Sequence, residues 1–284
     1  MNIPQHLVDE AISRALAEDF GLAGDLTSQA TIPADQRGTA VLLAKEAGVV
    51  SGLEVAAQVF AKLHSTATIK VLAHDGDPVA ARTDLLSITG SVRALLGAER
   101  TALNFARHMS GVATATARMV ELVAGTKTQI VCTRKTTPGL RAFEKYAVTC
   151  GGGHNHRFGL FDAILIKDNH IAACGGVAAA IRAARNHAGH LVKIEVEVDS
   201  MAKLDEALAE GPDVIMLDNM SPDEVRVAIA RIAGRARTEA SGGITSETVR
   251  AYAEAGVDLI SVGWITHSAP NLDLSLDFRA GPSV

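Results

Sequence analysis

The first third of the chain changes from a helical pattern of hydrophobic positions to short apolar runs. Residues 4–20 carry apolar side chains three and four positions apart, which predicts an opening helix. The short apolar runs that follow predict strands, and a helical pattern over 54–63 interrupts them. The predicted strands are 39–46, 49–52, 68–74 and 85–90. Strands with helices on one side are typical of a small α+β domain.

From Ser91 the pattern stays helical up to Gly125, and this long element is expected to link two domains. A serine and a glycine, Ser110 and Gly111, stand side by side within it. Such a pair predicts that the helix is split or kinked at this point.

Beyond Gly125, short apolar runs alternate with helical stretches. The predicted strands are 130–133, 163–167, 192–198, 214–218, 238–241 and 258–263. The predicted helices between them are 138–150, 176–188, 200–210, 222–235 and 246–255. This alternation favours βαβ units and a parallel sheet, although a doubly wound sheet remains open. We therefore expect an α/β fold with an N-terminal α+β sandwich domain (1–112), an open, incomplete α/β barrel of about six strands (113–268) and a tail (269–284) that packs back on the N-terminal domain.

The composition is that of a globular protein, with 48% hydrophobic and 21% charged residues among 284. No apolar run approaches the roughly 18 residues of a membrane span, and the amphipathic N-terminal helix carries acids, so neither a membrane anchor nor a signal peptide is expected. Three cysteines without a pattern favour a reducing, cytoplasmic location. Cys150, His154 and His156 could supply zinc ligands, but no second ligand cluster supports this alternative.

Residues 133–170 reverse the charge balance of the chain. The whole protein has 27 Lys and Arg against 32 Asp and Glu, whereas this stretch has six cations and three acids. It also contains three consecutive glycines, 151–153, and glycines let backbone N–H groups approach an anion closely. These features predict a pocket for a small polyanion. The composition offers no broad basic surface for nucleic acid.

Polar or glycine residues follow every predicted barrel strand, where parallel strands direct their carboxyl ends to one mouth. They are Arg134-Lys135, Lys167–His170, Glu195 with Glu197 and Asp199, Asp218-Asn219, Ser241–Gly243 and Gly263. The cations suit a ligand with carboxylates. Glu197 and Asp218 suit a Mg²⁺-bound sugar phosphate, because magnesium takes one or two carboxylates and glycine loops donate to phosphate. Glu195 could instead lie on the wet face of an edge strand.

Three strings, TRKTTPGLRAFEKYA, GGGHNHRFGLFDAILIKDNHI and MLDNM, are similar to the carboxylating quinolinate phosphoribosyltransferase family. The resemblance extends from Glu18 to Leu276. It implies transfer of phosphoribosyl from phosphoribosyl pyrophosphate to quinolinate with decarboxylation. The products would be nicotinate mononucleotide, pyrophosphate and CO₂, in NAD biosynthesis.

The resemblance also implies roles for residues of this chain. Substrate contacts are expected from Arg100, Thr133, Arg134, Lys135, His156, Arg157, Lys167, Glu197, Asp218, Ser241, Gly242, Gly243, Ser261, Val262 and Gly263. Of these, Lys135, Lys167, Glu197 and Asp218 are expected to be catalytic, with Mg²⁺ on Glu197 and Asp218, directly or through water. The family's usual assembly implies a homodimer in which Arg100 of one subunit completes the site of the other, and further assembly of such dimers is left open.

Three alternatives remain. A phosphoribosyltransferase-like protein of the molybdenum transport type shares part of the motifs, but it usually lacks the Lys-Asp-Asn-His string of 167–170. A nicotinate phosphoribosyltransferase binds one carboxylate and would not need so many cations. A non-catalytic anion-binding module would not need the acid pair Glu197 and Asp218. Cys132 and His154 depart from the usual family residues, which puts only local tuning of the site in doubt.

Overall fold

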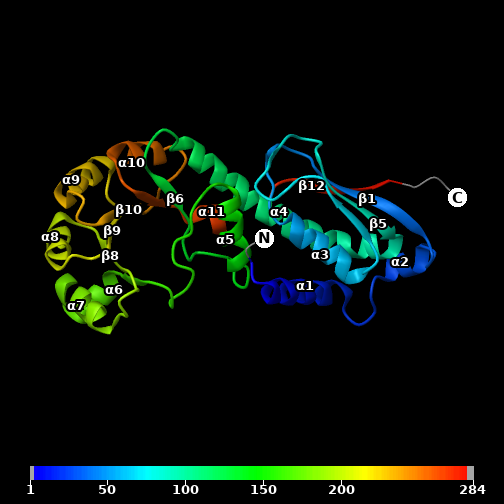
Figure 1. Ribbon diagram of the computed structural model, residues 1–284, viewed down its shortest axis with the longest axis horizontal. Coiled ribbons are helices and arrows are strands. Elements are labelled where there is room, and N and C mark those ends of the chain that lie inside the picture. Colours follow the sequence, from blue (N-terminus) through cyan, green and yellow to red (C-terminus); the bar gives the residue numbers. More distant parts are fainter. Residues whose placement is uncertain (1–2, 280–284) are drawn as a thin grey trace. The chain divides into compact units, whose positions relative to one another are not determined.

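The computed structural model describes residues 3–279, which form two compact units. Of the described residues, unit 1 contains 3–117, 137–152 and 268–279, and unit 2 contains 118–136 and 153–267. Figure 1 shows the elements of both units. Residues 137–152 belong to unit 1, although their position in the sequence lies within the range expected for the barrel.

Unit 1 is built on an antiparallel sheet with the strand order β12-β1-β5-β3. Its helices are α1 (Gln5–Phe20), α2 (Leu26–Thr31), α3 (Leu53–Leu63), α5 (Arg141–Cys150) and most of α4 (Val92–Leu122). Its strands are β1 (Arg37–Ala44), β2 (Gly48–Val49), β3 (Thr68–Val71), β4 (Pro78–Val79), β5 (Asp84–Ser91) and β12 (Leu274–Arg279). Helix α3 packs against β5 and α1 packs against α3, so the apolar face of α3 lies in the core. The α+β character predicted for this part of the chain is confirmed.

Helix α4 is continuous, so the expected split at Ser110 and Gly111 is wrong. The two residues serve close packing instead. The Ser110 hydroxyl accepts from Ser51 N (2.9 Å) and donates to Ser51 O (3.1 Å). A Cβ on Gly111 would collide with the backbone of Pro270 and Asn271. Small residues here let two segments approach the helix backbone closely. The sequence pattern alone does not distinguish this need for close packing from a kink.

Unit 2 is a parallel six-stranded sheet with the order β6-β11-β10-β9-β8-β7. Its strands are β6 (Gln129–Val131), β7 (Ile164–Ile166), β8 (Ile194–Val198), β9 (Val214–Asp218), β10 (Arg237–Ser241) and β11 (Leu259–Ser261). Its helices are α6 (Asp168–Cys174), α7 (Val177–His187), α8 (Met201–Glu210), α9 (Pro222–Ile232), α10 (Val249–Ala255) and α11 (Trp264–His267). Figure 1 shows α7 to α10 on the outer side of the strands. This arrangement confirms the expected open barrel and does not fit the doubly wound alternative.

Two helices of unit 2, α8 and α9, begin at serine N-caps, Ser200 and Ser221. At α9, Ser221 accepts from Glu224 N, and the Glu224 carboxylate accepts from Ser221 N at 2.8 Å. Pro222 follows at the first helical position, where its missing N–H costs nothing. Such caps fix the start of α8 and α9 directly behind β8 and β9. Helices α6 and α11 are too short to leave a periodic pattern, and the sequence did not predict them.

The two faces of the barrel strands differ in chemistry. Along β8, Ile194, Val196 and Val198 alternate with Glu195 and Glu197. The three apolar residues are buried, as expected for the face that the surrounding helices cover. The two acids occupy the other face, which is the interior of the barrel. The barrel therefore has a polar interior, and its strands direct these side chains toward one mouth.

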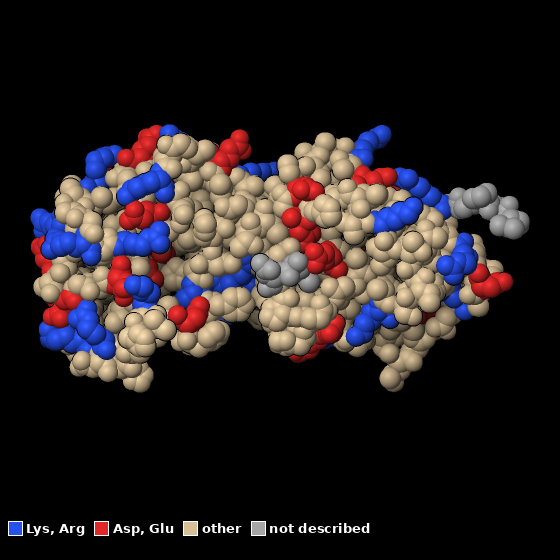
Figure 2. Space-filling view, viewed as in Figure 1, with Lys and Arg blue, Asp and Glu red and all other residues tan. Residues whose placement is uncertain are grey.

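The outer surface of unit 2 mixes both signs of charge. Figure 2 shows lysine and arginine interspersed with aspartate and glutamate over α7 to α10. Pairs such as Arg231 with Asp205 (2.8 Å between Nη1 and Oδ2) account for part of this pattern. No helix among residues 3–279 combines the length and apolarity that a membrane crossing requires.

Candidate active site

A cavity of about 720 Å³ lies at the carboxyl ends of the barrel strands. Its lining includes every residue of unit 2 for which a substrate contact is predicted: Thr133, Arg134, Lys135, His156, Arg157, Lys167, Glu197, Asp218, Ser241, Gly242, Gly243, Ser261, Val262 and Gly263. Arg100 is exposed on α4 and belongs to unit 1. Residues from six strand ends therefore meet in one cavity.

One side of the cavity holds acids and a lysine. Lys167 Nζ lies 2.9 Å from Glu197 Oε2, and Asn219 Nδ2 donates to Asp218 Oδ2 at 2.6 Å. Burial, followed by the neighbouring Glu197 carboxylate, raises the pKa of Asp218. The Glu197 carboxylate thus disfavours ionisation of Asp218, and the two side chains place carboxylate oxygens close together in the cavity. A divalent cation would relieve this repulsion, so the donor set suits Mg²⁺.

The glycine loop after β10 is held against the end of β9. Asn219 N donates to Ser241 O at 2.9 Å, and Asn219 itself has a positive φ of 56°. Gly242 has a φ of 100°, and a Cβ on it would collide with the Asn219 side chain. Only glycine fits this position, which keeps the backbone of the loop open to the cavity.

The loop after β6 is fixed by two threonines. Thr133 Oγ1 accepts from Lys135 N at 3.0 Å, and Thr266 Oγ1 donates to Lys135 O at 2.8 Å. A Cβ on Gly263 would lie 3.2 Å from Lys135 Cδ, so this glycine leaves space for the lysine stem. These contacts hold Lys135 at the rim of the cavity.

The other side of the cavity is cationic. Burial, and secondly the charge of Arg134, lowers the pKa of Arg157, so the two guanidinium groups lie near enough to repel each other. Arg157 Nη1 donates to Ala163 O at 3.2 Å. Arg134 Nε is buried and has no hydrogen-bond partner among the described residues. Two repelling cations, one with an unmet donor, suit an anion with more than one carboxylate.

The segment that carries His156 and Arg157 runs beside β6. Cys132 N donates to His154 O (3.1 Å), and His154 N donates to Ile130 O (2.9 Å). Cys132 Sγ also lies 3.2 Å from Asn155 Oδ1. This short parallel pairing brings His156 and Arg157 into the cavity. It also shows that Cys132, which departs from the family pattern, is packed against this segment.

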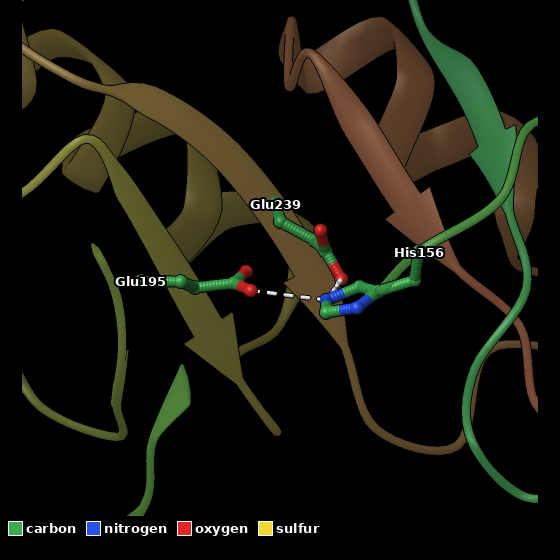
Figure 3. Close-up of side chains that lie close together, drawn as sticks. All are labelled: His156, Glu195 and Glu239. Carbon is green, nitrogen blue, oxygen red and sulfur yellow. Dashed lines mark ion pairs between the residues drawn. The ribbon is translucent and has the colours of Figure 1, made fainter. Parts of the chain in front are cut away.

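His156 sits between two buried glutamates, Glu195 of β8 and Glu239 of β10 (Figure 3). Glu195 is 7% exposed, and β8 lies between β7 and β9, so the alternative of a wet face on an edge strand is wrong. Burial, with the Glu195 charge next in importance, raises the pKa of Glu239. Among residues 3–279 these three side chains also form the one cluster with metal-ligand geometry, and it includes neither Cys150 nor His154.

Two family models match the chain. The quinolinate phosphoribosyl transferase N-terminal domain matches residues 25–110, and the C-terminal domain matches residues 112–277. The chain belongs to this family. The resemblance inferred from the three sequence strings is thereby confirmed.

Relatives within the quinolinate phosphoribosyl transferase family match along nearly their whole length. The nicotinate-nucleotide pyrophosphorylase (carboxylating) of Mycobacterium leprae is 47% identical over 273 residues, covering 94% of this chain and 96% of the relative. The crystal structure of NadC from Streptococcus pyogenes has a TM-score of 0.95 and 44% identity, covering 99% of both chains. The nicotinate-nucleotide pyrophosphorylase structure from Francisella tularensis has a TM-score of 0.94 and 40% identity, covering 98% of both chains.

The cavity of this family member also contains residues that the sequence did not single out as ligand contacts: Leu165, Met216, Asn219, Glu239, Ile244, Trp264 and His267. Glu239 could have been found, because it precedes Ser241 by two positions and therefore shares its face of the strand. Trp264 and His267 lie on α11, which the pattern did not predict.

Proposed function

We propose that this chain is a decarboxylating quinolinate phosphoribosyltransferase, which converts quinolinate and phosphoribosyl pyrophosphate to nicotinate mononucleotide, pyrophosphate and CO₂. One observation carries the proposal. A single cavity has a cationic side, with Arg134 and Arg157, and an acidic side, with Glu197 and Asp218. The first suits a pyridine dicarboxylate, and the second suits a metal-bound diphosphate sugar.

Quinolinate would bind on the cationic side through its two carboxylates. The unmet Arg134 Nε donor supports this assignment, because a buried donor without a partner is costly until a ligand accepts from it. Arg157 would supply further charge, Lys167 would reach the ligand from its place beside Glu197, and Thr133 would border the ring. A ligand with one carboxylate would leave part of this charge unmatched, which argues against nicotinate as the substrate.

Phosphoribosyl pyrophosphate would occupy the acidic side. Glu197 and Asp218 would hold Mg²⁺, which when bound supplies charge neutralisation for the diphosphate. Lys135 would reach the departing pyrophosphate. The loops Ser241–Gly243 and Ser261–Gly263 would donate backbone N–H groups to the terminal phosphate, with Gly242 and Val262 at their centres.

The chemistry needs positioning more than proton transfer. As the bond between the sugar C1 and the diphosphate oxygen breaks, the sugar gains oxocarbenium character and the pyridine nitrogen bonds to C1. The ring is then cationic, so the bond to the 2-carboxylate can break with its electron pair left on ring C2. CO₂ leaves and C2 takes up one proton. Arg134 and Lys167 would hold that carboxylate until it departs.

The proposed site is shared between two subunits of a homodimer. Arg100 is exposed on unit 1 and would complete the quinolinate side of the partner's cavity. A two-fold arrangement makes both sites composite in the same way. Assembly beyond the dimer stays a prediction.

A coupled assay tests the proposal. The purified protein is incubated with quinolinate, phosphoribosyl pyrophosphate and Mg²⁺, and release of CO₂ is measured beside formation of nicotinate mononucleotide. We expect both products in equal amounts, loss of turnover on chelation, and no turnover of nicotinate at matched concentration. Equal use of nicotinate, or no product from quinolinate, would refute the proposal.

A further inference from the structure

A partly buried histidine and two buried glutamates lie at the floor of the cavity, where His156 and Glu239 belong to its lining and Glu195 lies behind them. His156 Nε2 lies 3.0 Å from Glu195 Oε2 and 3.6 Å from Glu239 Oε1, and the two acids are 7% and 2% exposed. Figure 3 shows both carboxylates directed at the same ring nitrogen. A second cavity of about 330 Å³ lies beyond this floor, and His156, Arg157 and Glu239 line both cavities. The cluster therefore separates the mouth from the opposite part of the barrel.

The hydrogen bonds decide which nitrogen of His156 carries the proton. The backbone N–H of Arg157 donates to His156 Nδ1 at 2.7 Å. A nitrogen that accepts a hydrogen bond cannot itself be protonated, so the neutral ring must carry its proton on Nε2. That proton faces the Glu195 carboxylate, which accepts it.

This arrangement excludes two other roles for the ring in this conformation. A metal ion bound by Nε2 would require the proton to move to Nδ1, where the Arg157 N–H already points. An imidazolium would likewise place a second N–H against that donor. The ring therefore connects two parts of the protein: the barrel strand β8 on one side and the backbone of Arg157 on the other.

The connection bears on the cationic side of the mouth. Arg157 follows His156 directly, and its guanidinium lines the cavity while Nη1 donates to Ala163 O. Its backbone N–H donates to His156 Nδ1, and this bond restrains the backbone at the base of the Arg157 side chain. Movement of the imidazole would therefore move the base of the Arg157 side chain.

We infer that Glu195 is a positioning residue of the quinolinate site, which acts through the imidazole of His156 and is supported by the adjacent Glu239. The inference rests on the proposed function. Glu195 lies below the cavity and need not touch the substrate. It holds His156 in one tautomer and one orientation, and His156 holds Arg157 where a carboxylate of quinolinate would meet it. His156 is thus assigned a positioning role in place of the direct charge contact expected from the sequence.

The tautomer can be read without activity. We propose long-range ¹H–¹⁵N correlation spectra of the ligand-free protein with labelled histidine, with the His156 signals identified by their loss in His156→Asn. The expected pattern is one protonated nitrogen, Nε2, and one unprotonated nitrogen, Nδ1. Protonation of Nδ1, of both nitrogens or of neither would overturn the inference even in an active enzyme. Absence of turnover in the wild type would instead count against the proposed function.

Quinolinate binding provides the second test, by calorimetry without phosphoribosyl pyrophosphate. Glu195→Gln replaces a charge-assisted bond to Nε2 by a neutral one, so the Kd for quinolinate should rise up to about tenfold. His156→Asn keeps an acceptor near Nδ1 but loses the donor to Glu195, and it should have a similar effect. In the double variant the two effects should not add, because Glu195 acts only through His156.

The matched control is Asp258→Asn. Asp258 contacts the amino end of β10, the strand that carries Glu239, and lies away from the cavity mouth. Asp258 accepts from Thr238 N and Thr238 Oγ1 at 2.9 and 2.8 Å. This variant should lose stability but keep the quinolinate Kd. Phosphoribosyl pyrophosphate affinity should stay unchanged in Glu195→Gln. A multiplicative effect in the double variant, or an unchanged Kd in Glu195→Gln, would overturn the inference.

Discussion

Arg134 offers a test in which ligand binding and stability change in opposite directions. Its Nε is buried in the wall of the cavity and has no partner among the described residues. In Arg134→Lys a positive charge remains, but the planar guanidinium with its Nε and Nη donors is replaced by one ammonium group. Quinolinate should lose one charge-assisted bond of about 1.5–3 kcal/mol, so its Kd should rise about 10- to 150-fold.

The ligand-free protein should respond differently. An unmet buried donor costs about 1–3 kcal/mol, and lysine has no polar atom at that point of its stem. Arg134→Lys should therefore leave the free energy of unfolding unchanged or increase it by about 1 kcal/mol. Calorimetry with quinolinate and thermal unfolding without ligand measure the two effects separately.

Two controls make the result specific. Arg157→Lys breaks the bond from Nη1 to Ala163 O, so it should weaken both quinolinate binding and the fold. Arg182→Lys changes an exposed arginine that pairs with Glu210 on the outer helices, and it should change neither. If Arg134→Lys lowers stability as much as Arg157→Lys does, Arg134 is a structural residue and the reasoning fails.

Three further predictions concern the acidic side, the shared site and the floor. Asp218→Asn should abolish Mg²⁺-dependent binding of phosphoribosyl pyrophosphate and spare quinolinate binding without metal; equal loss of both would contradict the division of the cavity. Arg100→Ala and Lys135→Ala should each be nearly inactive, yet a co-refolded mixture should regain about a quarter of wild-type activity, because half of the dimers carry one intact site of two; no recovery would place Arg100 in the site of its own subunit. Burial, then the Glu195 charge, raises the pKa of Glu239 from 4.5 to about 8 in the folded protein, where His156 and Ser261 also face it. The unfolded chain therefore loses this proton first as pH rises, so stability should fall between pH 4.5 and 8. Glu239→Gln should flatten that slope in urea unfolding, and an unchanged slope would contradict the assignment.

The residues at the mouth of the barrel could be predicted because each of them stands at the end of a strand that the sequence pattern shows. A residue at the end of a parallel strand reaches the same edge as its neighbours, so Arg134, Lys167 and Asp218 could be grouped without knowing any distance. The place of Glu195 in the floor could not be predicted. A glutamate that alternates with valines is compatible with a wet outer face and with a polar interior, and only the strand order places Glu195 inside.

The other prediction that the structure contradicts failed because of contacts between segments that are distant in the sequence. Ser110 and Gly111 have the composition of a helix break, but their reason is the close approach of Ser51 and of the backbone at Pro270. The roles of Mg²⁺, of the dimer and of the individual site residues stay predictions for the experiments above.

The pairing of β12 with β1 has a consequence for the order in which the protein can fold. Thr39 faces Arg279 and Ala44 faces Leu274, so one edge of β1 is covered by residues translated only after the entire barrel has been made. Until then the nascent chain carries an apolar strand with an open row of N–H and C=O groups. Strands β7 to β11 pair with their neighbours in sequence and can assemble before β12 is translated and completes the first sheet. We therefore expect β1 to be the segment that a chaperone, or a second nascent chain, meets during synthesis.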